Sequence, residues 1–100
     1  MYKQISYDEA VSLISSKTIV IADVRDSESY ERSHITDAVH LSIPALQEFC
    51  DQSDKLVPIL VYCHHGISSR SAAQHLVDQG FLEVYSLDGG FELWKSQYSA

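Results

Sequence analysis

The sequence predicts an α/β fold in which helices cover both faces of a mostly parallel central sheet. Residues 18–22 and residues 59–63 are continuous apolar runs of strand length, and such runs are typical of strands buried on both faces. Predicted strands alternate with predicted helices along the chain, which favours parallel strands joined by helical crossovers. In sheets of this kind, ligand sites lie beyond the carboxyl ends of the strands.

The first half of the chain supplies two strands and three helical segments. Residues 6–9 read Ser-Tyr-Asp-Glu, a capping-box pattern, and the apolar residues after them predict a short amphipathic helix. Residues 18–22 predict the first strand, residues 26–31 one or two helical turns, and residues 38–42 a short strand. The next segment predicts a helix with four apolar residues on one face: Ile43, Leu46, Phe49 and Cys50.

The second half repeats the alternation. Residues 59–63 predict a second buried strand with Cys63 as its last residue, and residues 69–79 predict a helix that Gly80 ends. Residues 84–87 predict the last strand, and residues 91–97 a closing helix. We expect Cys63 to lie at the carboxyl edge of the sheet, where Asp23 and Asp88 end two other strands.

Size and composition narrow the class of protein. One hundred residues is close to the usual domain size, so residues 1–100 are expected to form a single domain. The net charge of −7 argues against nucleic acid as a partner. No apolar run has membrane-spanning or signal-peptide character, so we expect a cytoplasmic protein with free thiols at Cys50 and Cys63 and no membrane partner. No apolar stripe indicates an oligomer interface, and the oligomeric state stays open.

Residues 63–70, Cys-His-His-Gly-Ile-Ser-Ser-Arg, join the second buried strand to a helix. The first turn of a helix presents unpaired backbone N–H groups and a partial positive charge, which stabilise a thiolate and bind anions. Gly66 is expected where the loop needs a positive φ or a close backbone approach. The segment therefore predicts a nucleophilic Cys63 beside an anion site.

The energy needed to ionise this thiol is modest. A free cysteine with a pKa near ~8.5 is only a few per cent thiolate at pH ~7. Lowering its pKa by roughly two units requires about 2.7 kcal/mol of preference for the anion. A helix terminus supplies about 0.3–2 kcal/mol of this, and N–H donors of the loop are expected to supply the remainder.

Three blocks of the chain resemble the rhodanese family, and most closely its single-domain thiosulfate sulfurtransferases. The blocks are Asp23-Val24-Arg25 with Tyr30 and His34-Ile35, the loop Cys63–Ser68, and the run Asp88–Trp94. The resemblance implies a rhodanese-like three-layer sandwich with a five-stranded sheet. It also implies that sulfur moves from thiosulfate to cyanide, a small thiol or a dithiol protein through a Cys63 persulfide. No metal or organic cofactor is implied.

The resemblance also implies a set of site residues. Cys63 is the catalytic residue, and the substrate-binding loop comprises His64, His65, Gly66, Ile67, Ser68, Ser69 and Arg70. His65 is favoured over His64 as a participant because the family shares it. Arg70 is expected either to attract or contact the anionic donor or to remain in solvent. Cys50 is expected in the core, and Asp23 and Arg25 in a structural pair.

Two positions depart from the family pattern. Ser33 stands where the family usually has glycine, which predicts backbone strain at that turn. Ser68 replaces the basic residue that many rhodaneses place at the end of the loop. Other groups must then attract an anionic substrate.

Three other functions fit parts of the same pattern. A rhodanese-fold phosphatase or arsenate reductase would have a longer loop, and a cysteine phosphatase needs the arginine of C-x5-R, a position that Ser69 fills here. A zinc site formed by Cys50, Cys63, His64 and His65 lacks the usual spacing of ligand pairs. A non-catalytic or persulfide-sensing interaction module is a different class, and its members commonly lose the cysteine that this chain keeps.

Overall fold

The computed structural model describes residues 1–16 and 18–98. Its strands are β1 (Lys3–Ile5), β2 (Val20–Asp23), β3 (Val39–His40), β4 (Ile59–Tyr62) and β5 (Val84–Leu87). Its α-helices are α1 (Tyr7–Ser16), α2 (Ser27–Arg32), α3 (Leu46–Gln52), α4 (Ser68–Asp78) and α5 (Gly90–Tyr98), and a 3-10 helix, η1 (Ile43–Ala45), precedes α3. The alternation of strands and helices that the sequence predicts is confirmed.

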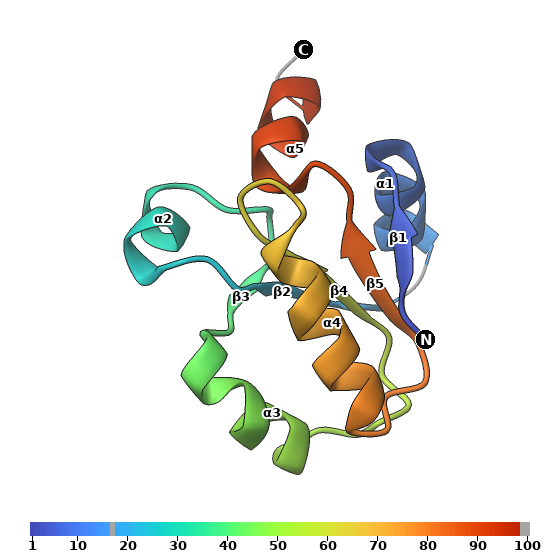
Figure 1. Ribbon diagram of the computed structural model, residues 1–100. Helices are drawn as coiled ribbons and strands as arrows, with labels where there is room; N and C mark the ends of the chain where they lie inside the picture. Colours follow the sequence, from blue (N-terminus) through green and yellow to red (C-terminus); the bar gives the residue numbers. More distant parts are fainter. Residues whose placement is uncertain (17, 99–100) are drawn as a thin grey trace.

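The five strands form one sheet in the order β1-β5-β4-β2-β3, and every neighbouring pair is parallel. The carboxyl ends of all five strands therefore meet at one edge (Figure 1). At this edge β2 ends at Asp23, β4 is followed by Cys63, and β5 is followed by Asp88. The expectation that these three residues lie at the carboxyl edge is confirmed.

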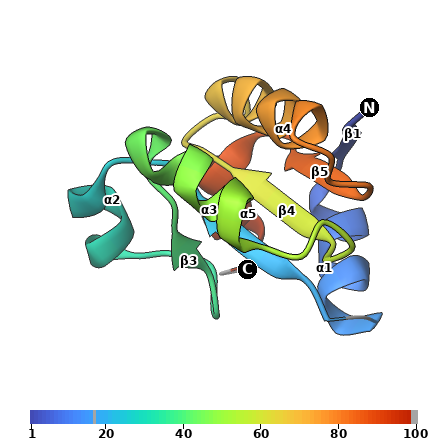
Figure 2. The ribbon, with the colours of Figure 1, turned by 90° about the horizontal axis from the view of Figure 1, so that it is seen from below.

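Helices cover the sheet on both faces, as Figure 2 shows for α4 and α1. One core layer holds buried residues of α3 and α4 against the sheet: Leu46, Cys50, Ala72, Ala73 and Leu76 with Ala22, Ile59, Val61 and Val84. The opposite layer holds buried residues of α1 and α5: Ala10, Phe91 and Trp94 with Ile5, Ile21, Leu60, Tyr62 and Leu87. Alternate residues of β4 thus face opposite layers, which explains why its sequence is apolar throughout.

Two helices begin at side chains that satisfy their first backbone N–H groups. The Ser6 hydroxyl accepts the N–H of Glu9 at 3.2 Å, and the Glu9 carboxylate accepts the N–H of Ser6 at 3.1 Å. This reciprocal pair is the predicted capping box. Asp26 caps α2 by accepting the N–H of Ser29 at 3.0 Å.

The structure corrects several predicted boundaries. Strand β1 was not predicted, and β2 begins at Val20 rather than at residue 18. The helix predicted from Ile43 begins at Leu46, because Pro44 lies in the tighter η1 turn before it and Ile43 is exposed. The strand predicted over residues 38–42 is reduced to Val39–His40, at the edge of the sheet where only β2 pairs with it.

The predicted strain at Ser33 is wrong. Ser33 has φ −170° and ψ 139°, which is extended backbone open to any residue. Its carbonyl accepts a hydrogen bond from the Arg25 guanidinium at 2.6 Å. A glycine is therefore not required here.

Candidate active site

The sulfur of Cys63 lies at the centre of a tight backbone loop. Cys63 directly follows β4 and is only 5% exposed. The chain then curls back so that the backbone N–H groups of Gly66 and Ser69 both donate to its Sγ at 3.2 Å. Ser69 stands in the first turn of α4, so the loop and the helix terminus supply donors to one atom.

These donors decide the protonation of the thiol. Burial by itself raises the pKa of Cys63, because a thiolate is poorly stabilised away from water. Hydrogen bonds from the side chain and backbone of Ser69, and from the backbones of Gly66 and His65, outweigh burial and lower the pKa below that of a free cysteine. Cys50 shows the contrast, since burial raises the pKa of its thiol. Of the two cysteines, Cys63 is therefore the one that ionises more readily to the nucleophilic thiolate.

The start of α5 clamps the loop. The N–H of Phe91 donates to the carbonyl oxygen of Cys63 at 2.8 Å, and the N–H of Glu92 donates to that of His64 at 3.1 Å. The contact is close because Gly90, at φ +59°, has no Cβ; one would lie 2.5 Å from the carbonyl oxygen of Cys63. The glycine pair after Asp88 therefore shapes the site.

Gly66 meets both conditions that the sequence suggested for it. Its φ is +88°, and a Cβ there would lie 2.7 Å from the backbone nitrogen of Gly89. Only glycine adopts this conformation without strain. Gly66 therefore turns the loop sharply and also lets it lie against the backbone of Gly89, just after β5.

A buried ion pair supports the strand that carries Cys63. The Arg25 guanidinium donates to both carboxylate oxygens of Asp23 at 2.8–3.1 Å, and it lies 4.3 Å from the centre of the Phe91 ring. The Tyr62 hydroxyl donates to Asp23 at 2.6 Å and accepts the N–H of Ile35 at 3.2 Å. Burial and the Asp23 carboxylate raise the pKa of Tyr62, which keeps this donor protonated. The structural pairing predicted for Asp23 and Arg25 is present.

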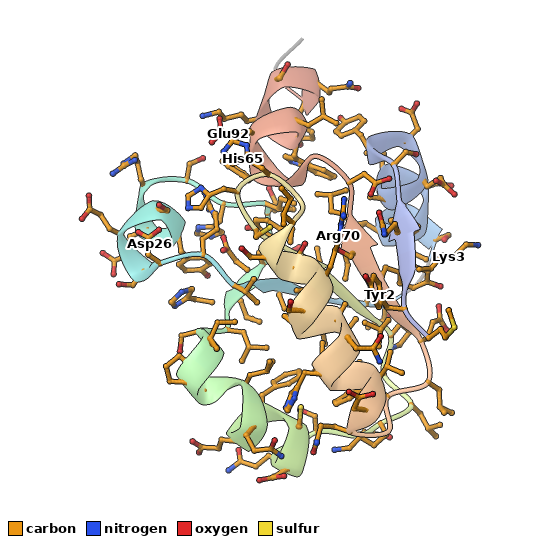
Figure 3. The ribbon with its side chains drawn as sticks, in the orientation of Figure 1. Tyr2, Lys3, Asp26, His65, Arg70 and Glu92 are labelled. Atoms are coloured by element: carbon orange, nitrogen blue, oxygen red, sulfur yellow. The ribbon has the colours of Figure 1, made fainter. Side chains whose placement is uncertain are left out.

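The side chains of the loop divide into buried and exposed groups. Ser69 is fully buried, and His64 is half-buried with its Nε2 3.3 Å from the Asp26 carboxylate. The remaining side chains of the loop are exposed: His65, Ile67, Ser68 and Arg70. Figure 3 shows His65 beside Glu92 at the start of α5, and Arg70 at the end of α4 nearest the loop. The hydrogen bonds to the sulfur come from Gly66 and Ser69 rather than from these exposed side chains.

A hollow of about 100 Å³ lies beside His64, and two basic residues that the sequence did not predict for the site line it. Arg32 of α2 and Lys95 of α5 line it, but each is paired with a carboxylate: Arg32 with Glu28 at 3.0 Å and Lys95 with Glu92 at 3.1 Å. No local sequence signal links residues so far apart along the chain. A larger hollow of about 430 Å³ between α1 and α5 contains none of residues 63–70.

Residues 1–16 and 18–98 were also searched for a metal site and for a membrane-spanning helix. Within these ranges no three histidine, cysteine or carboxylate side chains are grouped as metal ligands, so a zinc site that includes Cys50 gains no support. Nor does any helix in the same ranges have the length and hydropathy needed to span a membrane.

Comparison with known proteins agrees with the fold. The model of the Rhodanese-like domain family matches residues 6–97, and the chain belongs to this family. A thiosulfate sulfurtransferase GlpE of Coxiella burnetii is 62% identical over 98 residues, which cover 98% of this chain and 92% of that protein. The protein of the same name from Pseudomonas entomophila is 47% identical over 97 residues, covering 97% and 88%.

Solved structures share the architecture. The solution structure of a rhodanese-like domain from Anabaena sp. superposes with a TM-score of 0.86 at 27% identity, and the match covers 97% of this chain and 76% of that one. The predicted rhodanese-like three-layer sandwich is therefore confirmed. The class that fold and site define is a rhodanese-fold sulfurtransferase, and the curated relatives place the chain beside the GlpE group within it.

Proposed function

We propose that this protein is a thiosulfate sulfurtransferase that works through a persulfide on Cys63. The observation that carries the proposal is the geometry at Sγ, where the N–H groups of Gly66 and Ser69 converge on a buried sulfur with a lowered pKa. A backbone cradle of this kind favours an anionic sulfur both before and after transfer. The names of the GlpE relatives support thiosulfate as the donor.

The proposed reaction has two displacements at sulfur. The Cys63 thiolate attacks the sulfane sulfur of thiosulfate, a new S–S bond forms, and sulfite leaves with the electron pair of the bond that breaks. A second nucleophile then attacks the outer sulfur of the persulfide and releases the Cys63 thiolate. Cyanide, a small thiol or a dithiol protein can serve as this acceptor. The cycle is balanced without a metal or an organic cofactor.

The loop residues take distinct roles in this proposal. The backbone around Gly66 and Ser69 holds the charged sulfur, and the exposed Arg70 attracts the donor, assisted by His64 and His65 when they are protonated. Residues 1–100 act as a single rhodanese domain. Because the cycle needs a reduced thiol at Cys63, a reducing compartment such as the cytoplasm is the proposed location.

The phosphatase and arsenate reductase alternatives fit the site less well. The position that C-x5-R reserves for an oxyanion-gripping arginine holds Ser69, which is fully buried and has no positive charge. An interaction module without chemistry would not need the lowered pKa of Cys63. Neither alternative is favoured by a contact in the site.

The test compares two reactions of one preparation. Sulfite release from thiosulfate is measured with cyanide or dithiothreitol as acceptor, and hydrolysis of an aryl phosphate is measured under the same conditions. We expect steady sulfite release and negligible phosphate release. A phosphatase kcat/KM equal to that for thiosulfate, or an absence of sulfite release with either acceptor, would overturn the proposal.

A further inference from the structure

The hollow of about 100 Å³ beside His64 gathers positive charge in a protein whose net charge is −7. Four basic side chains line it, and each comes from a different part of the fold: Arg25 after β2, Arg32 in the last turn of α2, His64 in the loop and Lys95 of α5. Among the described lining residues Glu92 is the one carboxylate, and Lys95 pairs with it at 3.1 Å. The wall of the hollow therefore carries an excess of cations.

These cations differ in how firmly they are held. Arg25 is buried and bonded to both carboxylate oxygens of Asp23, so it stays in place. Arg32 pairs with Glu28 on the surface, where the two side chains are 70% and 83% exposed, and such exposed pairs contribute little. A guanidinium carries several N–H donors, and Arg32 gives one of them, on Nη2, to Glu28. Arg32 is therefore the cation that turns toward an anion in the hollow at small cost.

The size and place of the hollow define the group that fits it. Its volume is about 100 Å³, the space of about three water molecules at about 30 Å³ each, or of one carboxylate or sulfonate. His64 directly follows Cys63, but neither Cys63 nor residues 65–69 line the hollow. An anion there lies beside the reacting sulfur and not on it. Thiosulfate has its oxyanion bonded directly to the transferred sulfur, whereas a thiol can carry an anionic group on a short carbon spacer.

We propose that the hollow between α2 and α5 is a subsite for the anionic group of a thiol acceptor, and that Arg32 selects such an acceptor. The proposal rests on the proposed function in taking Cys63 as the sulfur carrier. The acceptor thiolate attacks the outer sulfur of the persulfide, an acceptor persulfide forms, and the Cys63 thiolate leaves. Meanwhile the carboxylate or sulfonate of the acceptor binds Arg32, with His64 and Lys95 on the neighbouring walls. A neutral thiol makes the same attack without this contact.

The first test needs no sulfur transfer from thiosulfate. The probes 2-sulfonatoethyl methanethiosulfonate and 2-hydroxyethyl methanethiosulfonate each pass a substituted ethylthio group to the Cys63 thiolate and release methanesulfinate. Modification of the Cys63 peptide is followed by mass spectrometry, and the ratio of the anionic to the neutral rate is compared. A change in the pKa of Cys63 cancels in this ratio, because both probes react with the same thiolate.

Arg32→Ala is expected to lower that ratio about fivefold, the effect of one charge about 4 Å away in water. Glu28→Gln, which removes the carboxylate that competes for Arg32, is expected to raise it. Lys3→Ala makes the same change of net charge as Arg32→Ala, on β1 and away from the loop, and its ratio is expected to match that of the parent. An equal fall in Lys3→Ala would overturn the proposal, as would an unchanged ratio in Arg32→Ala.

The second test uses turnover. Thiosulfate is the donor, and 2-mercaptoethanesulfonate or the neutral 2-mercaptoethanol is the acceptor. Arg32→Ala is expected to lower kcat/KM for the sulfonate thiol about fivefold relative to the neutral thiol. An equal fall in kcat/KM for thiosulfate would overturn the assignment of the hollow to the acceptor. A parent protein that shows the probe preference but transfers no sulfur would contradict the proposed function and leave the anion subsite standing.

Discussion

The backbone N–H of Phe91 donates to the carbonyl oxygen of Cys63 at 2.8 Å, which ties the nucleophile to the first turn of α5. The Phe91 ring in turn lies under the Arg25 guanidinium, whose carboxylate partner Asp23 is bonded to Tyr62. These contacts hold the backbone of Cys63, while the loop that follows surrounds its sulfur. Substitutions that disturb the loop and substitutions that disturb the contacts with α5 are therefore expected to affect activity in different ways.

Gly66→Ala tests the part played by the loop around the sulfur. At φ +88° a side chain costs about 1–2 kcal/mol, and the new Cβ would also meet the backbone of Gly89 at 2.7 Å. Displacing the loop by about 1 Å is expected to lower kcat/KM by about 100-fold. Thiosulfate kinetics and urea unfolding measure the two effects.

Gly80→Ala is the matched control for that variant. Gly80 also has a positive φ, +104°, but a Cβ there would meet only Lys55 Cγ at 3.9 Å. We expect Gly80→Ala to lose only the roughly 1–2 kcal/mol that the positive φ costs, less than Gly66→Ala, with kcat/KM nearly unchanged. Equal losses of kcat/KM in both variants would mean that general destabilisation, not loop geometry, lowers activity.

The two cysteines are expected to react with alkylating agents at different pH. Hydrogen bonds to Cys63 lower its pKa despite burial, whereas burial raises the pKa of Cys50. Cys63 should therefore be modified with a midpoint below the value of about 8.5 for a free thiol, and Cys50 should resist modification until the chain unfolds. Peptide mass spectrometry across a pH series distinguishes the two.

The same lowered pKa predicts how pH affects folding stability. Because the folded pKa of Cys63 lies below the unfolded one, the thiolate stabilises the fold above the unfolded value near ~8.5. This contribution decreases as pH falls through the folded pKa. Comparing Cys63→Ser with the parent by denaturant unfolding across that window isolates it. A parent whose stability relative to Cys63→Ser falls as pH rises would contradict the assigned direction.

Arg70→Ala tests how an acidic protein captures an anionic donor. Arg70 is exposed and lies at the end of α4 nearest the loop (Figure 3). Removing one partly solvated cation is expected to weaken capture by roughly 1 kcal/mol, which raises KM for thiosulfate about fivefold with a smaller change in kcat. Added salt should raise KM in the parent in the same direction.

Lys3→Ala makes the same change of charge away from the loop, on β1, as Figure 3 shows. Its KM is expected to match that of the parent. Equal values of KM in Arg70→Ala and the parent would leave Arg70 as a solvent-facing helix residue. Substrate capture would then rest on the backbone cradle.

The elements that the sequence predicted well are those marked by a pattern of buried apolar side chains. Strand β5 has the predicted bounds, and β4 ends one residue before Cys63, because apolar side chains on both faces mark such strands. Strand β1 could not be predicted, since two of its three residues, Lys3 and Gln4, are exposed and only backbone pairing with β5 makes it a strand.

The site shows the same division. Cys63 and Gly66 could be chosen from the sequence because their chemistry depends on residue type and local order. The contact between Ser69 and Ser86 could not, since it joins residues 17 positions apart along the chain. Arg32 and Lys95 were missed for the same reason, because α2 and α5 meet beside the loop only in the folded chain.

The mass of the protein after incubation with thiosulfate tests the central claim most directly. One added sulfur atom is expected on the peptide containing Cys63, and cyanide or excess dithiol should remove it. Cys63→Ser should gain no mass and show no turnover, whereas Cys50→Ser should behave like the parent. Sulfur found on Cys50, or turnover of thiosulfate by Cys63→Ser, would contradict the assignment of Cys63 as the sulfur carrier.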